Sequence, residues 1–473
     1  MGKRQSKFSP SKAASSVKIV SLYPREDSPF TETPTAESEN TMSGVEYVVC
    51  DAEELKDGEM KEVEVGSRKA LLVREGGNYY AVGPKCSHFG APLASGVLCN
   101  GRVRCPWHGA CFNIKTGDIE DFPGLDSIPK FDVSVKNGKV FVKDDPTTSG
   151  NKRVKPMSKA SRDNKQTFVL IGSGAASVTC AQTLRQEGFT GRVVMVTQEK
   201  YLPYDRTKLT KVMTTKPEDI ALKDAEFYKS ADIEIMNEKE VVGVDTKTKS
   251  VTFKDGGNIK YDSLLIATGG KPRILPIPGI ELDNVCQVRN PAEANKIGND
   301  TAGKNVVILG SSFIGLEVAA FMASRKTNSI TVIGRSSMPL QVILGKQVGA
   351  VYKKLHEEKG VKFYFENSIK EFVGENGKVK EVLLADGTKL PADICVLGIG
   401  VVPSTDFLKN SGINLTSRGF VTVDKGLKTN VAGVFAAGDI VEFPLFMNEN
   451  TASNVQHWQM ANQHGETWFV IGQ

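Results

Sequence analysis

The chain has 473 residues, of which 40% are hydrophobic, and this is enough for about three domains with separate cores. Its formal net charge is +5, but the first twenty residues carry five basic residues and no acidic one, so the remaining chain has no basic excess and nucleic-acid binding is disfavoured. No run of about 18 apolar residues occurs, and the sequence therefore predicts no transmembrane helix.

Residues 1–44 are rich in serine, threonine, proline and glutamate, a composition that predicts a disordered tail. The stretch Met1–Ser6 fits the pattern M-G-x-x-x-[ST] of N-myristoylation, and an acyl chain beside basic residues is a workable membrane anchor. The same basic, serine-rich stretch also resembles a mitochondrial targeting segment, and an unmodified tail is the third interpretation. Scattered cysteines indicate a reducing compartment, so we expect an intracellular location, in the mitochondrion or at the cytoplasmic face of a membrane.

Residues 45–144 show short alternating runs bounded by turn residues, for example Ala70–Val73, which predict a small β-sandwich. Two loops in this stretch carry Cys86 with His88 and Cys105 with His108. A Rieske 2Fe-2S cluster needs two thiolates for one iron and two imidazoles for the other. The same four side chains could also form a tetrahedral zinc site, although zinc sites usually begin with C-x2-4-C rather than C-x-H.

Residues 145–165 are polar and basic and predict a flexible linker. After it, the apolar run Phe168–Ile171 leads into Gly172, Gly174 and Ser177 of a G-x-G-x-x-S turn, the fingerprint of a strand, tight turn and helix that bind a dinucleotide pyrophosphate. Two later strands end in Thr268-Gly269 and in Gly438-Asp439. We assign residues 166–290 and 414–473 to one dinucleotide-binding domain.

A second dinucleotide-binding domain is predicted over residues 291–413. Its strand Val306–Leu309 leads into Gly310, Ser312 and Gly315, where a nicotinamide dinucleotide is expected to bind. The next strand ends with Arg335 instead of the acid that would bond the ribose 2′-hydroxyl of NADH. NADPH is therefore a candidate donor beside NADH, and a solvated loop charge is the alternative for Arg335.

The run Pro-Trp-His-Gly-Ala-Cys-Phe after Cys105 resembles Rieske domains, and the motifs that follow resemble flavoprotein reductases. Residues 45–473 as a whole resemble the Rieske-containing branch of the apoptosis-inducing factor family, and their second part also resembles NADH-dependent ferredoxin reductases. The most specific match is Leu202–Lys211, which is similar to the family segment L-P-Y-x-R-x-x-L-S-K. The resemblance implies a multidomain fold, with an N-terminal Rieske β-sandwich followed by α/β Rossmann-type FAD and NAD(P) domains of the ferredoxin reductase and glutathione reductase kind.

The same resemblance implies the residue roles. Lys211 is expected beside the flavin, paired with Glu317, and these two are the expected catalytic residues. Asp439 is expected to bond the ribityl chain, and Glu199 to hold the adenosine ribose in place of a family acid that falls at Gln198. The other residues expected to contact FAD are Gly172, Gly174, Ser177, Arg206, Thr268, Gly269, Arg273 and Trp458, while Gly310, Gly315 and Arg335 are expected to contact NAD(P).

The implied activity is an NAD(P)H-dependent oxidoreductase that passes electrons through FAD to the fused 2Fe-2S cluster and an unknown acceptor, with a role in apoptosis. The alternative is a redox-regulated apoptotic signalling protein with slow turnover. No C-x-x-C pair occurs in the sequence, so disulfide reductase chemistry is not expected. Members of the family continue into a small C-terminal α/β domain, which is expected to be absent here.

Overall fold

The computed structural model describes residues 44–144 and 150–471, which lie in one compact unit, Gly44–Gln473. The tail predicted for residues 1–44, together with its acylation and targeting interpretations, lies outside the described residues except for Gly44. None of the helices in the described ranges is both long and apolar enough to cross a bilayer.

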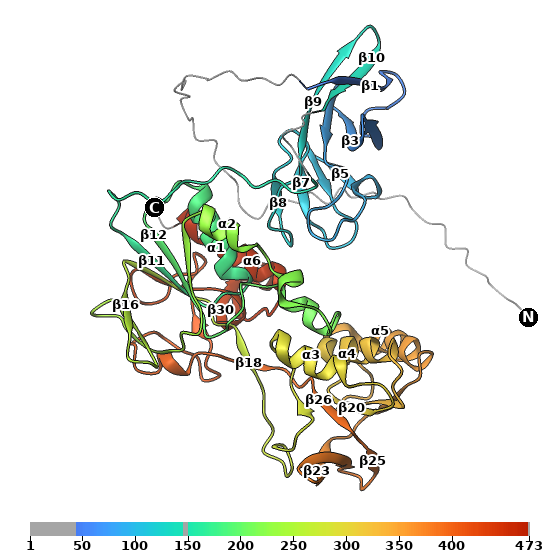
Figure 1. Cartoon of the computed structure of the whole chain (residues 1–473), viewed down its shortest axis with the longest axis vertical. Coiled ribbons are helices and arrows are strands. Elements are labelled where there is room, and N and C mark those ends of the chain that lie inside the picture. The colour runs from blue at the N-terminus through green and yellow to red at the C-terminus, as the bar shows by residue number, and fades with distance from the viewer. Residues whose placement is uncertain (1–43, 145–149, 472–473) are drawn as a thin grey trace, which may run out of the picture. The chain divides into compact units, whose positions relative to one another are not determined.

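The N-terminal region consists of two antiparallel sheets (Figure 1). The larger sheet has the strand order β1-β10-β9-β4-β3-β2 and the smaller one the order β5-β6-β7-β8. The strands of the larger sheet are β1 (Glu46–Asp51), β2 (Met60–Val65), β3 (Arg68–Glu75), β4 (Asn78–Val82), β9 (Lys130–Lys136) and β10 (Lys139–Lys143). Those of the smaller sheet are β5 (Val97–Cys99), β6 (Arg102–Arg104), β7 (Cys111–Asn113) and β8 (Ile119–Asp121), and a 3-10 turn η1 spans Leu93–Ser95.

Strand β3 shows how the sequence fixes this sandwich. Leu71 and Val73 pack in one hydrophobic core, which includes Cys86 and Cys105, whereas Ala70 and Leu72 pack in a second core on the opposite face. Side chains alternate between the two faces of a strand, so four successive apolar residues form a strand that is buried on both sides. This strand therefore separates the core that carries the two cysteines from the outer core of the sandwich.

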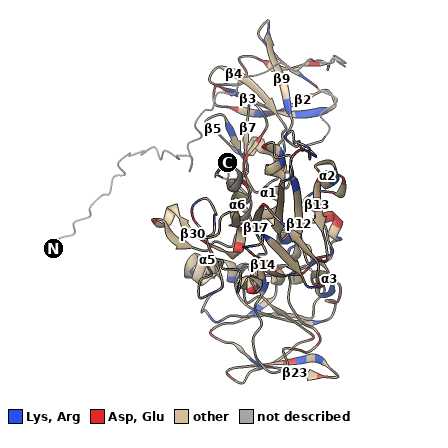
Figure 2. Ribbon diagram, turned by 90° about the vertical axis from the view of Figure 1, so that its left-hand side faces the viewer, with Lys and Arg blue, Asp and Glu red and all other residues tan. Residues whose placement is uncertain are grey.

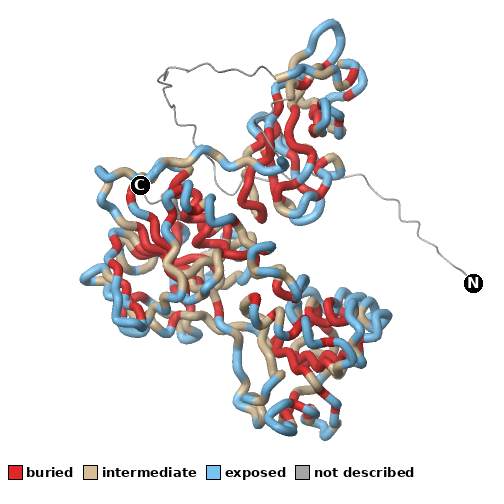
Figure 3. The backbone as a smooth tube through the Cα atoms, viewed as in Figure 1, coloured by how far each residue is buried: buried red, intermediate tan, exposed pale blue. Residues whose placement is uncertain are grey.

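The first α/β unit has a parallel five-stranded sheet in the order β13-β12-β11-β17-β29. Its strands are β11 (Thr167–Ile171), β12 (Arg192–Val196), β13 (Ile233–Met236), β17 (Ser263–Ile266) and β29 (Val434–Ala436). Strand β17 carries no charged residue and the inner strands are buried, as parallel strands covered on both faces must be (Figures 2 and 3). The helices of this unit are α1 (Ala175–Gln186), α2 (Ala225–Ser230) and α6 (Trp458–Ile471).

Small sheets and 3-10 turns complete the first unit. One sheet contains β14 (Val241–Asp245), β15 (Ser250–Phe253) and β16 (Asn258–Lys260), and another contains β28 (Val421–Thr422), β30 (Val441–Leu445) and β31 (Thr451–Ser453). The 3-10 turns are η2 (Arg206–Thr210), η3 (Pro217–Ile220), η4 (Asp406–Leu408), η5 (Gly438–Ile440) and η6 (Phe446–Asn448).

The second α/β unit repeats the architecture with a parallel sheet in the order β19-β26-β20-β21-β22. Its strands are β19 (Val285–Cys286), β20 (Asn305–Leu309), β21 (Ser329–Ile333), β22 (Val361–Tyr364) and β26 (Ile394–Leu397), and its helices are α3 (Pro291–Asn299), α4 (Phe313–Ala323) and α5 (Gln341–Glu357). A side sheet contains β23 (Ile369–Glu375), β24 (Lys378–Leu384) and β25 (Lys389–Pro391). Because β19 pairs with β26, this sheet includes residues that precede the boundary predicted at residue 291.

The two α/β units are joined by a pair of short antiparallel strands. Strand β18 (Gly270–Pro272) leaves the first unit and pairs with β27 (Val401–Pro403), which returns from the second. The chain crosses from the first unit to the second once and returns once, as expected when one dinucleotide-binding domain is inserted into another. The chain therefore returns after β27 to complete the first sheet with β29.

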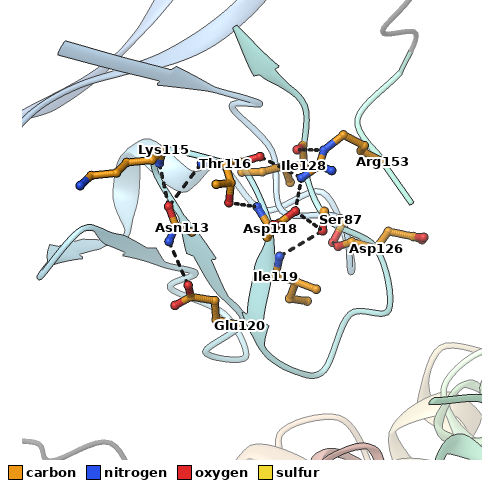
Figure 4. Close-up of polar contacts among 11 residues, drawn as sticks. Ser87, Asn113, Lys115, Thr116, Asp118, Ile119, Glu120, Asp126, Ile128 and Arg153 are labelled. Atoms are coloured by element: carbon orange, nitrogen blue, oxygen red, sulfur yellow. Dashed lines mark hydrogen bonds and ion pairs between the residues drawn. The ribbon is translucent and has the colours of Figure 1, made fainter. Parts of the chain in front are cut away.

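The segment predicted as a flexible linker differs from that expectation over its described part, residues 150–165. The Arg153 amide donates to the carbonyl of Ser127 at 2.8 Å, and its guanidinium donates to the carbonyl of Thr116 at 2.8 Å and pairs with Asp118 (Figure 4). Further along, the amide of Ser158 donates to the carbonyl of Arg185 at 2.7 Å. The segment is fixed to both the β-sandwich and the first α/β unit, because its basic side chains and amides find acceptors that composition alone does not reveal.

Candidate functional site

The two cysteine-histidine loops, Cys86–Ala91 and Cys105–Ala110, share one backbone design. In each loop the cysteine amide donates to the alanine carbonyl five residues later, at 2.9 and 2.8 Å, and the glycine amide donates to the cysteine carbonyl, at 2.9 and 3.2 Å. Gly90 and Gly109 adopt φ values of +74° and +77°, which a residue with a Cβ adopts at a cost. The matching Cys, Gly and Ala positions of CSHFGA and CPWHGA were visible in the sequence, but our sequence analysis missed this repeat.

The four predicted ligands lie together as two pairs. Cys86 lies close enough to Cys105 for that thiol to help burial raise the pKa of Cys86, and the ring centroids of His88 and His108 are 5.1 Å apart. A mononuclear zinc site would need all four ligands on one ion, whereas a 2Fe-2S cluster needs one pair for each iron. The arrangement favours the cluster over zinc.

Burial affects the expected ligands Cys86 and His88, whereas His108 is exposed. This burial raises the pKa of the Cys86 thiol to about 11, and together with the charge of His108 it lowers the pKa of His88 to about 4. The Nδ1 atom of His88 is buried and has no hydrogen-bond partner. A buried polar atom without a partner is costly unless a ligand satisfies it, so Nδ1 is the atom of His88 that would bind iron.

One cavity of about 710 Å³ is lined by His88 and His108, by the first glycine turn and by the start of α4, the helix that follows the second glycine motif. Its wall includes the turn after β11, the Thr268-Gly269 turn and Asp439 from the first α/β unit, and Phe313, Ile314 and Glu317 from α4 of the second. The predicted residues that line it are His88, His108, Gly172, Gly174, Glu199, Arg206, Lys211, Thr268, Gly269, Glu317, Asp439 and Trp458. Residues from three separate regions of the sequence therefore share one site.

The turn after β11 has the geometry of a dinucleotide cradle. Gly172 has φ +110°, and a Cβ there would lie 2.3 Å from the carbonyl oxygen of Ala267. Gly174 caps the N-terminus of α1, and a Cβ there would meet no atom within 4 Å, so its outer side is open. The open space lies in front of the first amides of α1, where a pyrophosphate can accept hydrogen bonds. These residues fit FAD.

A charged group flanks the cradle. Arg206 pairs with Glu199 at 2.8 Å, and the hydroxyl of Tyr204 donates to the other oxygen of Glu199 at 2.6 Å. Burial opposes the charge on Arg206, but Tyr204 and Glu199 hold its pKa above its ordinary value. Glu199 is thus held at the cavity wall by two side chains of its own domain, and each carboxylate oxygen keeps a lone pair for a ribose hydroxyl.

Arg289 is a cavity residue that the sequence analysis did not identify. Its guanidinium lies 3.0 Å from the position that a Cβ on Gly269 would take, so a larger residue there would have to displace the end of the arginine. Burial and the nearby charge of Arg206 lower the pKa of Arg289 to about 10. Burial raises the pKa of Asp439, against the opposing charges of Arg289 and Arg206. The sequence places Arg289 in an unremarkable loop between β19 and α3, and no motif marks it.

The expected pair of Lys211 and Glu317 forms in the structure. The Lys211 ammonium lies 2.9 Å from a Glu317 carboxylate oxygen, and the hydroxyl of Thr210 donates to the same oxygen. Lys211 follows η2 in the first α/β unit, whereas Glu317 lies on α4 in the second. The two units thus contribute one residue each to an ion pair that lines the cavity.

The second glycine motif has the same backbone as the first. Gly310 has φ +120° and a Cβ there would lie 2.2 Å from the carbonyl oxygen of Gly398, while a Cβ on Gly315 would lie 1.9 Å from that of Gly310. Ser312 caps α4 in an extended conformation, φ −98°, like that of Gly174, φ −83°. A serine therefore causes no backbone strain there. Its Cβ takes the position in the second motif that corresponds to the open side of Gly174 in the first.

Some predicted residues lie outside the cavity. Ser177 is a buried residue of α1 with an unpaired hydroxyl, whereas Gly310, Gly315 and the exposed Arg335 belong to the second glycine motif and the strand end beside it. The structure does not bring Arg273 into the cavity. It is exposed, because it directly follows β18, whose pairing with β27 directs the chain away from the first α/β unit.

The chain matches two family models. Residues 45–132 match the Rieske [2Fe-2S] domain, and residues 166–465 match the pyridine nucleotide-disulphide oxidoreductase family. These matches confirm the predicted fold class, and they confirm the 2Fe-2S cluster, FAD and NAD(P)H as cofactors.

Individual relatives agree. Apoptosis-inducing factor 3 from Homo sapiens is 47% identical over 427 residues, which cover 89% of this chain and 70% of the relative. The ferredoxin–NAD(+) reductase subunit of the benzene 1,2-dioxygenase system from Pseudomonas putida is 33% identical over 280 residues, covering 58% of this chain and 67% of that protein.

Among solved structures, the ferredoxin reductase for the CYP199A2 system from Rhodopseudomonas palustris has a TM-score of 0.60 at 27% identity, and it is covered over 74% of its length by 64% of this chain. The covalent putidaredoxin reductase–putidaredoxin complex has a TM-score of 0.62 at 26% identity, with the same two coverages. The chain therefore belongs to the apoptosis-inducing factor 3 family of NAD(P)H-dependent flavoprotein oxidoreductases that carry a Rieske domain.

Proposed function

We propose that this protein passes electrons from NAD(P)H through FAD to its own 2Fe-2S cluster, which then reduces a separate acceptor. One observation carries the proposal. His88 and His108 line the same cavity as the FAD cradle at Gly172 and Gly174. Since imidazoles are the ligands of one of the two irons, a flavin in the cradle and the cluster would face a shared space.

The residues of the chain would divide the work. When bound, FAD supplies the two-electron chemistry with NAD(P)H and the one-electron chemistry with the cluster. The cradle and Arg206 would hold its phosphates and ribose, and Asp439 its ribityl chain. Lys211 would place a positive charge beside the flavin ring, and Glu317 would orient that ammonium through the 2.9 Å ion pair.

The fused Rieske domain would take the place of a separate ferredoxin. Several relatives are named ferredoxin reductases, and one similar structure is a complex of a reductase with putidaredoxin. Here the first electron acceptor is part of the same chain, so its concentration at the flavin is set by the fold and not by diffusion. The family name connects such proteins to apoptosis, and we propose that this role would draw on the same redox chemistry.

An anaerobic titration of the purified protein with NADH or NADPH tests this function. We expect the flavin absorbance to bleach and a Rieske-type EPR signal to develop in the reduced sample. Continuous oxidation of NAD(P)H with an added acceptor would support an oxidoreductase. Reduction of both centres without sustained turnover would favour the redox-regulated signalling protein instead. Bound cofactors that NAD(P)H cannot reduce would exclude the NAD(P)H-dependent oxidoreductase and would also favour the regulatory protein.

Arg335 provides a test of the choice between NADH and NADPH. It is exposed at the end of β21, where a cationic side chain can meet a 2′-phosphate. Arg335→Ala is expected to raise the KM for NADPH by about tenfold and to leave the KM for NADH unchanged, because one exposed charge-assisted contact contributes roughly 1–2 kcal/mol. Steady-state kinetics with both nucleotides decide. Equal changes for both would mean that Arg335 does not meet the 2′-phosphate.

A further inference from the structure

The segment Phe122–Ser127, which follows β8 of the smaller sheet of the β-sandwich, is buried against the first α/β unit. Pro123 through Ser127 are all buried. Leu125 belongs to the hydrophobic core of the first α/β unit, which carries the FAD cradle and is called the FAD-binding unit below. This core includes residues of β11, β12 and α1, and Phe122 packs against it. A side chain of the Rieske domain therefore completes the core of another domain.

Polar side chains of α1 and α6 hold the backbone of the same segment. The amide of Gln182 donates to the carbonyl of Leu125 at 2.9 Å. On α6, Gln459 donates to the carbonyl of Phe122 at 3.2 Å and to that of the cluster ligand His108 at 2.6 Å. Of these three contacts, the one between Gln182 and Leu125 is buried, the one between Gln459 and Phe122 is partly buried, and the one between Gln459 and His108 is exposed. The buried carbonyl of Leu125 thus has the partner that a buried polar group requires.

A buried ion pair closes this contact. Lys223, between η3 and α2, pairs with Asp126, and the two side chains are only 6% and 8% exposed. The exposed Lys152 lies 3.7 Å from the same carboxylate. The carbonyl of Asp126 accepts a hydrogen bond of 2.5 Å from the hydroxyl of Ser87, which lies between the ligands Cys86 and His88 (Figure 4). Lys223 is therefore linked through Asp126 and Ser87 to the loop that carries Cys86 and His88.

We infer that Lys223 and Asp126 are positioning residues, which lock the Rieske domain against the FAD-binding unit so that electrons reach the cluster in one fixed, docked geometry without a domain swing. This inference rests on the proposed function. We call the segment Phe122–Ser127, with Lys223, Gln182 and Gln459, the latch. Leu125, Asp126 and Lys223 are buried in contacts that a swinging domain would have to break and reform at every turnover.

The fixed geometry has a kinetic consequence. If transfer occurs only in the docked state, the observed rate constant is the intrinsic rate constant multiplied by the docked fraction. A latched protein is almost always docked, so its rate should not depend on solvent viscosity. A protein with a weakened latch must diffuse back into place, and its rate should fall and become viscosity-dependent.

The test variant is Lys223→Met, which removes the ammonium and keeps an apolar stem of similar length. The measurements on the holoprotein are flavin bleaching after mixing with NADH, the rise of the Rieske EPR signal by freeze-quench, its dependence on added sucrose, and small-angle X-ray scattering. We expect flavin reduction to be unchanged, cluster reduction to slow by about tenfold or more and to become viscosity-dependent, and the radius of gyration to increase.

Three further variants keep the result interpretable. Lys223→Arg keeps the charge and is expected to retain most of the rate. Gln182→Leu removes a neutral contact of the latch, leaves no unpaired charge, and should weaken docking even if Lys223→Met does not fold. Lys254→Met is the matched control, because it removes an exposed ion pair with Glu240 inside the FAD-binding unit and should change nothing.

The outcomes separate the two ideas. If cluster reduction and the scattering profile are unchanged in both Lys223→Met and Gln182→Leu, the latch is wrong while the proposed function stands. A viscosity-dependent rate in the wild type would also contradict fixed docking. If the flavin of the wild type is reduced but its cluster never is, the proposed function fails, and the latch as a device for electron transfer fails with it.

Discussion

Cys86→Ser is expected to remove the 2Fe-2S cluster while FAD remains bound and is still reduced by NAD(P)H. One iron would lose a thiolate, and serine, whose hydroxyl does not ionise readily, does not replace it. Cys86 is also almost fully buried in the core between the two sheets of the sandwich, so no exposed side chain can take its place. We expect iron content, the visible bands of the cluster and the Rieske EPR signal all to fall to background.

Cys111→Ser is the matched control for this prediction. Cys111 lies on β7, close in sequence to the second cluster loop, and it is as buried as Cys86. It lies outside both Cys-His loops, and the sequence assigns it no ligand role. This variant should keep its iron. Retention of the cluster in Cys86→Ser, or its loss in Cys111→Ser only, would mean that the ligands are assigned wrongly.

Lys211→Met is expected to slow flavin reduction by about 100-fold, a cost comparable to that of removing one preorganised donor from an active site. The ammonium faces the cavity and is held by Glu317, so its positive charge is fixed where reduction would place negative charge. Glu317→Gln should have a smaller effect, about tenfold, because the amide keeps a hydrogen-bonding oxygen for Lys211 but loses the charge. Stopped-flow absorbance after mixing with NAD(P)H measures both.

Lys216→Met is the control for the catalytic pair. Lys216 is an exposed lysine five positions after Lys211 in the same stretch, and it does not line the cavity. Its rate of flavin reduction should match that of the wild type. Cluster content should be normal in all three variants, since none touches the Rieske loops. A normal rate in Lys211→Met would assign the ion pair a role in joining the two α/β units instead.

Local patterns were sufficient for the fold class. A strand that runs into glycines at fixed spacing specifies a turn before a helix, because Gly172 and Gly310 need positive φ and have no room for a Cβ. The paired Cys and His loops were equally explicit, since few chemistries use those residues at that spacing. The comparisons confirm both inferences.

The structure departs from the sequence expectations, or adds to them, where residues distant in sequence come into contact. Composition predicted a flexible linker at 145–165, but Arg153 meets acceptors on the sandwich, and Ser158 donates to the first α/β unit. Arg289 carries no motif and reaches the cavity only because the loop after β19 passes over Gly269. Arg273 was assigned to FAD, yet the pairing of β18 with β27 leaves it exposed outside the cavity.

The sequence by itself determined the chemistry of this protein: a Rieske domain, two dinucleotide-binding units and the residues that each motif requires, because these depend on spacing within a single loop or turn. Only the tertiary structure decided how the centres meet. It brings His88 and His108 to the cavity of the FAD cradle, and it buries Leu125 and Asp126 against another domain. Such contacts depend on which surfaces lose water together, and no local pattern encodes that choice.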